Sequence, residues 1–265
     1  MKRFIALFLA LLMCFALCAC GKNSSKAGLS ADELNTAETE AVQSPEESSA
    51  PAVNDTSKLV SDAFSDTLQG DSESYPFAIP CINLQSAEIK ALNQAIYDEY
   101  YPKYQVAKEQ ISTQGYTTDC GYIAYKWYVN GDILSLVIDE YCAPDFGGGD
   151  VYKVYNISIS GMSELGKDAV LKAAGISAGD FSGMVKETLQ KTFESFYGNG
   201  GSGIEAQFAS EQLARTLSDE NISACSPYLN EHGELCITAR IYSMAGADYY
   251  FNNINLVSGN MISYN

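Results

Sequence analysis

The sequence is poor in histidine, and His232 is the only one in 265 residues. Hydrolytic triads usually take a histidine as the base, and zinc-dependent deacetylases and amidases need more than one histidine ligand. His232 lies in the stretch NEHG, which is typical of a hairpin turn, so we expect its side chain to be exposed. We therefore predict no catalytic triad and no metal site, and we expect no cofactor.

Basic residues are also few. The chain has 16 Lys and Arg against 33 Asp and Glu, and its formal net charge is −17. Binding to nucleic acid needs a basic patch that neutralises phosphates, so nucleic acid is excluded as a partner. An acidic domain either attracts cationic partners or gains only solubility from its charge.

No apolar run is long enough to span a bilayer. The longest, Phe4 to Ala19, has about 16 residues, whereas a spanning helix needs about 20. It follows a basic start and ends in LCACG at 17–21, which resembles a bacterial lipobox. We predict that residues 1–20 are a lipoprotein signal peptide. Cys20 would then carry the lipid that anchors the chain on the extracytoplasmic face of the cell membrane.

Residues 21–72 have almost no aromatic side chains, Phe64 being the exception. Ser, Ala, Glu, Asp and Thr dominate this segment, and no sustained apolar face appears. Such a composition cannot bury enough surface to offset the loss of chain entropy. We predict an acidic disordered tether over 21–72, with at most a short, marginal helix over 59–68.

From Glu73 onward the pattern becomes that of a folded domain. An extended segment precedes a helix that Ser86 caps, and Pro102 should kink or end this helix before a second piece that reaches Ile111. Asn130-Gly131 suits a type I′ hairpin turn, which would pair Trp127 with Leu134. Strands are predicted at 151–159 and 249–257, and a further hairpin at 224–242. Helices are predicted at 167–174, 181–197 and 211–217.

Strands joined by hairpin turns and separated by helices indicate an α+β fold, in which antiparallel sheets of hairpins pack with helices. We place this domain at 73–257, with sub-lobes at about 73–160 and 161–257, and a tail at 258–265.

The predicted hairpin has one apolar face and one mixed face, and the mixed face carries Tyr122 and Tyr128. Either another layer covers the mixed face, which we favour, or it is an aromatic binding surface. In this register Cys120 lies opposite Tyr141, so a disulfide with Cys142 would need a β-bulge. The cysteines after Cys20 are odd in number, and buried free thiols are the alternative for all of them. They are Cys81, Cys120, Cys142, Cys225 and Cys236.

A glycine-rich loop, DFGGGD, follows the hairpin, with Asp145 and Asp150 at its ends. It lacks the Gly-Lys-Ser of a phosphate-binding loop. The two aspartates could bind a ligand or a cation through their oxygens, or they could lie in a solvated turn. Tyr122, Tyr128, Asp145 and Asp150 are the candidate ligand-binding residues. The pair Asp139-Glu140 receives no role, because chance acidic pairs are common among 33 acids.

Several stretches resemble the RsiV-like and PdaC-like family of extracellular domains in the same serial order. They are YPFAIPCINLQSAEIKALNQAI, NGDILSLVI, VYNISISGMSEL and GELCITARIYSMAGADYY. The family occurs as surface lipoproteins, beside polysaccharide deacetylase domains, and as outer domains of anti-sigma factors that sense lysozyme. The resemblance implies an extracytoplasmic binding module. Gly149-Asp150 departs from it, because the family often has Ala-His at that place.

We therefore expect a lipid-anchored binding or sensing module rather than an enzyme. Its ligand would be cell-wall glycan, such as peptidoglycan, or a cationic protein such as lysozyme. The alternative is an accessory enzyme of cell-wall polysaccharide metabolism that uses carboxylates. A glycan binder predicts exposed aromatic rings on the mixed face, a lysozyme binder predicts clustered acids, and an enzyme predicts polar groups that converge in a cleft.

Overall fold

The computed structural model describes residues 55–142, 149–198, 203–244 and 248–264. The predicted signal peptide with Cys20, most of the predicted tether, and Asp145 lie outside these residues. The description below concerns the unit Ser49–Asn265.

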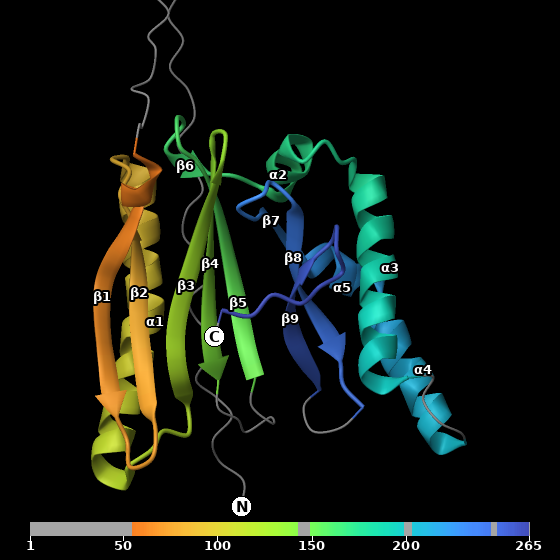
Figure 1. Ribbon diagram of the computed structural model, residues 1–265, viewed down its shortest axis with the longest axis horizontal. Helices are drawn as coiled ribbons and strands as arrows, with labels where there is room; N and C mark the ends of the chain where they lie inside the picture. Colours follow the sequence, from red (N-terminus) through yellow and green to blue (C-terminus); the bar gives the residue numbers. More distant parts are fainter. Residues whose placement is uncertain (1–54, 143–148, 199–202, 245–247, 265) are drawn as a thin grey trace, which may run out of the picture. The chain divides into compact units, whose positions relative to one another are not determined.

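The first sheet has six strands in the order β1-β2-β3-β4-β5-β6 (Figure 1). The strands are β1 Val60–Gln69, β2 Ser74–Ile82, β3 Cys120–Asn130, β4 Ile133–Cys142, β5 Gly149–Ser158 and β6 Ser163–Glu164. All neighbours pair antiparallel except β2 and β3, which are parallel. The helix α1 (Ala87–Gln114) connects these two strands, as a parallel pair requires. The predicted α+β class is confirmed, although the parallel pair was not predicted.

The predicted tether is wrong for its last part, because Val60–Gln69 is the edge strand β1. A 3-10 turn, Thr56–Lys58, precedes it. Val60 is buried, and Phe64 and Leu68 pack against the core beneath α1. Most other side chains of β1 are polar and exposed, so composition alone favoured disorder, whereas pairing with β2 provides the missing stability. The folded domain therefore begins before Glu73.

The helix α1 runs without interruption through Pro102, which corrects the prediction of two pieces. Ser86 caps its start, since its Oγ accepts a hydrogen bond from the Ile89 N–H at 3.1 Å. Gly115, with φ of 80°, ends it. Buried side chains on both sides of Pro102 pack on the first sheet, and this packing outweighs the one backbone hydrogen bond that proline removes.

The β3–β4 hairpin turns at Gly131-Asp132, one residue later than predicted, so Trp127 pairs with Leu136 instead of Leu134. Gly131 has φ of 58°, and a glycine with positive φ at the first central position is typical of a type II′ turn. The Asp132 carboxylate accepts hydrogen bonds from the Ser158 and Ser160 hydroxyls and fixes this turn to the end of β5. A shift of two residues leaves each side chain on its predicted face.

The second sheet is antiparallel, in the order β7-β8-β9, and it packs with four helices (Figure 1). The elements are β7 Ser226–Leu229, β8 Leu235–Tyr242, β9 Tyr249–Asn255, α2 Lys167–Ala173, α3 Ala178–Tyr197, α4 Ile204–Thr216 and α5 Asp219–Ala224. The predicted apolar face of α3 is buried from Phe181 to Phe193, whereas Phe196 is 45% exposed. No helix in the described part of the chain is long and apolar enough to cross a membrane.

The mixed face of the hairpin is covered, as favoured from the sequence. Tyr128 stacks on Tyr228 of β7, with ring centroids 5.9 Å apart, and Val137 is fully buried between the two sheets. The Tyr264 hydroxyl lies 3.2 Å from the Tyr228 hydroxyl and accepts a hydrogen bond from Asn253 Nδ2 at 3.0 Å. The predicted tail at 258–265 is therefore part of the fold as far as residue 264.

Candidate functional site

Four side chains form a tyrosine–aspartate cluster on the covered face of the first sheet: Tyr122, Asp139, Asp150 and Tyr152. Strand pairing brings them together, because Asp139 lies opposite Tyr152, while Tyr141 lies between Tyr122 and Asp150. Directly opposed residues in antiparallel strands point to the same face. The cluster lies at the end of the sheet where β3 and β5 begin and β4 ends (Figure 1).

Hydrogen bonds join the tyrosines to the carboxylates. The Tyr122 hydroxyl donates to Asp150 Oδ1 at 2.5 Å and lies 3.4 Å from Asp139 Oδ2. The Tyr152 hydroxyl donates to Asp150 Oδ2 at 3.3 Å. Asp150 thus accepts hydrogen bonds from two phenols, and the Tyr122 hydroxyl bridges the two aspartates.

Asp139 is the unusual member of the cluster. Asp139 is 1% exposed, and its Oδ1 has no hydrogen-bond partner. Among the buried side-chain nitrogen and oxygen atoms of the described residues, it is the only unpartnered one. Burial and the neighbouring Asp150 carboxylate raise the pKa of Asp139 to about 7, against a small opposing effect of the Tyr122 hydroxyl. The Asp139 carboxyl group therefore titrates near neutral pH.

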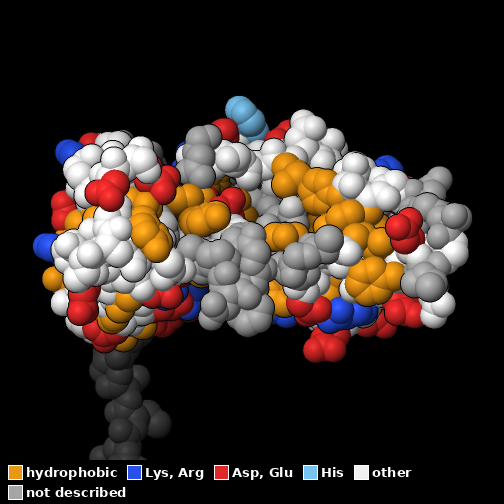
Figure 2. All heavy atoms as spheres, turned by 90° about the horizontal axis from the view of Figure 1, so that it is seen from below, with side chains coloured by type: hydrophobic (Ala, Val, Ile, Leu, Met, Phe, Trp, Pro, Cys, Tyr) orange, Lys and Arg blue, Asp and Glu red, His pale blue; other side chains and the backbone are white. Residues whose placement is uncertain are grey.

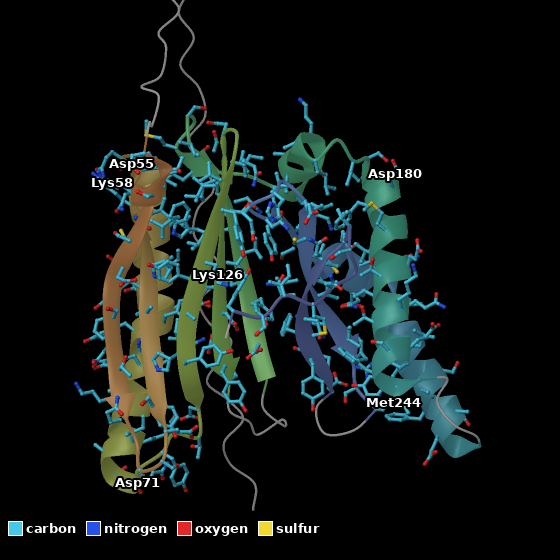
Figure 3. All side chains as sticks on the ribbon, viewed as in Figure 1. Asp55, Lys58, Asp71, Lys126, Asp180 and Met244 are labelled. Atoms are coloured by element: carbon cyan, nitrogen blue, oxygen red, sulfur yellow. The ribbon has the colours of Figure 1, made fainter. Side chains whose placement is uncertain are left out.

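In the described parts of the chain, no lysine or arginine forms an ion pair with either aspartate. The nearest basic residue on this face of β3 is Lys126, which is labelled in Figure 3. Lys126 pairs with Val137 and not with Asp139. Its Nζ lies 4.8 Å above the Tyr264 ring. The negative charge of the cluster is thus left without a compensating cation.

The structure unites two of the four predicted ligand-binding residues, Tyr122 and Asp150. Tyr128 lies further along β3 under the second sheet, and Asp145 is outside the described residues. Asp139 was missed because its neighbour Glu140 made the pair look like chance. The available signal was its position: Asp139 is the one charged residue that β4 places on the mixed face.

The end of the second sheet near this site is aromatic and carries arginine. The Arg240 guanidinium lies over the Tyr249 ring at 4.8 Å and over the Phe251 ring at 5.3 Å. Arg215 lies 4.0 Å over the Tyr242 ring and binds both oxygens of Asp248. Figure 2 looks onto this end of the molecule and shows hydrophobic side chains gathered there, with acidic groups at their margins.

In the structure, all five cysteines of the domain are reduced. Cys120 and Cys142 are register partners, with a bulge in β3 between Cys120 and Tyr122. The bulge that a disulfide would need is therefore present, and the bond itself stays a prediction. Within the described ranges, no group of three or more His, Cys, Asp or Glu side chains could hold a metal ion. His232 is exposed, as expected.

Comparison with known proteins gives no further assignment: no protein-family model and no curated protein matches the chain.

Proposed function

We propose that the protein is a lipid-anchored extracytoplasmic binding module whose partner is a cationic protein, such as lysozyme, that presents a basic group to the tyrosine–aspartate cluster. The observation that carries the proposal is the buried Asp139 Oδ1 without a donor, beside a second carboxylate and without a nearby cation.

An unpartnered buried acceptor is unfavourable by about 1–3 kcal/mol, so a folded domain gains when a ligand supplies the missing donor. A lysine ammonium or an arginine guanidinium supplies both the donor and the positive charge. Tyr122, Asp150 and Tyr152 are half-buried, so the basic group would approach past them to reach Asp139. The acidic balance of the whole chain would steer a basic protein toward the domain.

A cationic partner is favoured over glycan by the state of the tyrosines. Sugar binding on the mixed face would need exposed rings at Tyr122 and Tyr128. Tyr122 is stacked with Tyr141 at 5.8 Å between ring centroids, and Tyr128 is stacked on Tyr228. Both rings therefore pack against other tyrosine rings of the domain. The resemblance to extracellular domains that sense lysozyme supports the same choice.

The test is titration calorimetry of the full chain in detergent with lysozyme, at low and moderate salt, with muropeptides as the competing ligand class. We expect lysozyme to bind at micromolar affinity or tighter, more weakly at the higher salt. Asp139→Asn should weaken binding at least about tenfold, because it removes a charge-assisted hydrogen bond. Glu109→Gln, which removes one charge from an exposed position on α1, is the matched control.

Absence of lysozyme binding, or equal affinity of the Asp139→Asn and Glu109→Gln variants, would overturn the proposal. Binding of muropeptides alone would assign the domain to glycan instead.

A second candidate function is the accessory enzyme that uses carboxylates. It is favoured by one observation: two neighbouring carboxyl groups, one of which titrates at about pH 7, form the kind of pair that acid–base hydrolysis uses. Release of soluble fragments from peptidoglycan by the full chain, lost in Asp150→Asn, would support it. A module that only binds releases none.

A further inference from the structure

We propose that Cys120 and Cys142 form a cross-strand disulfide when the chain folds in an oxidising compartment. The bond would link β3 to β4 at the end of the hairpin that lies opposite its turn. The inference rests on the geometry of these two residues and on the predicted export, and it is independent of the ligand proposed above.

The first observation is the register. Cys120 at the start of β3 and Cys142 at the end of β4 are directly opposed across an antiparallel pair. Opposed residues in such a pair have Cα atoms roughly 4.5–5.5 Å apart, which is within the range that a disulfide bridges. The bulge between Cys120 and Tyr122 creates this opposition, because without it Cys120 would lie one position out of step.

The second observation is that both thiols lie on the side of the sheet that α1 covers. Cys120 is 2% exposed and belongs to the core beneath α1. Cys142 Sγ donates to Glu140 Oε1 at 3.1 Å, and the other oxygen of Glu140 binds Lys103 of α1. Opposition in register and a shared face are two of the conditions that a cross-strand disulfide needs.

The other three cysteines lack a cysteine partner in register. Cys81 lies opposite Ser61, and Cys236 lies between Tyr228 and Asn255. Cys225 follows α5, and its Sγ donates to Asn221 O at 3.4 Å. One disulfide and three thiols therefore account for the odd number of cysteines.

Bond formation requires an oxidant, which we take to be the disulfide of an extracytoplasmic thiol oxidoreductase. One cysteine thiolate attacks this disulfide, forms a mixed disulfide and releases one thiolate of the oxidant. The thiolate of the second cysteine then attacks the mixed disulfide and releases the other. Two electrons pass to the oxidant, and the two protons of the cysteine thiols pass to its two released thiolates.

The timing follows from burial. In the folded domain, burial together with the Glu140 carboxylate raises the pKa of Cys120 and that of Cys142 to about 12, so almost no reactive thiolate exists at neutral pH. The disulfide must then form while the chain folds, and a domain folded in the reduced state should oxidise slowly.

The experiment compares the full chain refolded with oxidised glutathione and with excess reductant. Free thiols are alkylated and the chain is mapped by mass spectrometry without reduction. We expect a linked Cys120–Cys142 peptide in the oxidised sample, kept in Cys81→Ser and absent in Cys142→Ser. Reduction should lower the Tm by about 5–10 °C, and Cys120→Ala/Cys142→Ala should remove that response.

Alkylation of both Cys120 and Cys142 in the oxidised sample would overturn the inference, as would a linkage to any other cysteine. Fast oxidation of the domain that was folded under reductant would overturn the proposed timing.

Discussion

Asp139 and Glu140 are neighbours in β4, and they point to opposite faces of the first sheet. Both are buried, at 1% and 4% exposure. Glu140 faces α1, where one oxygen binds Lys103 and the other accepts a hydrogen bond from the Cys142 thiol. Asp139 faces the second sheet, where one oxygen lacks a donor and the nearest charge is another carboxylate.

The two buried carboxylates differ in how far the fold itself supplies their partners. A buried carboxylate that the fold pairs on both oxygens is complete without a ligand. A buried carboxylate that the fold leaves half unpaired is unfavourable for stability, and such groups cluster at binding and catalytic sites. Two adjacent residues of the same strand thus differ in what they need from outside the molecule.

The largest expected effect comes from Asp139→Asn, which removes the unfavourable charge. Between the unfolded pKa near 3.8 and the folded pKa of about 7, folded Asp139 keeps its proton while the unfolded chain has lost it. Folding therefore takes up a proton, and this contribution to stability, about 4 kcal/mol when complete, disappears as pH rises through 7. Urea unfolding from pH 4 to 8 should show this decline in the wild type and not in Asp139→Asn. A decline of equal size in the variant would contradict the assignment.

A smaller effect is expected on the other face, where Lys103→Met would leave Glu140 without its cation. An unpaired buried carboxylate destabilises strongly, and the partial exposure of Lys103 reduces the effect to about 2–3 kcal/mol. Urea unfolding at pH 7 measures it, with Lys90→Met on the exposed side of α1 as control. Glu140→Gln in the same chain should restore part of the loss. Equal stability of the Lys103 and Lys90 variants would break the comparison.

The smallest effect concerns the bridge between the two aspartates. Tyr122→Phe removes a hydroxyl that lowers the pKa of Asp139, so that pKa should rise further. The expected loss of stability is about 1 kcal/mol. Carbon NMR of the Asp139 carboxyl group follows the titration, and Tyr141→Phe, which keeps the ring stack, is the control. A midpoint that stays in place or falls in Tyr122→Phe would argue against the bridge.

The sequence allowed the faces of the hairpin to be predicted better than its register. Alternation of apolar and mixed residues survives a shift of two positions, so Ile123 and Ile138 were placed in the core correctly although their pairing was wrong. In the observed register Asn130 pairs with Ile133 across the turn. The Asp132 carboxylate favours this register because it binds Ser158 at the end of β5. Such long-range contacts are not visible in a local pattern.

The edge strand and the role of Asp139 in the cluster were missed for a related reason. β1 is polar along most of its length, and only its pairing with β2 and the contacts of Phe64 under α1 make it a strand. The pKa of Asp139 depends on Asp150 and Tyr122, which lie on two other strands. The predicted hairpin already placed Tyr122 opposite Asp139, whereas Asp150 lies on β5 beyond the glycine-rich loop and cannot be inferred from residues close to Asp139 in the chain.

Proton release on binding tests the central claim most directly. The full chain would be titrated with lysozyme at pH 7 in buffers of different ionisation heat. A cation bound at the cluster lowers the pKa of Asp139, so the half-protonated group should release about half a proton per complex, and Asp139→Asn should release none. Binding without proton release, or equal release from both proteins, would place the partner elsewhere and contradict the account.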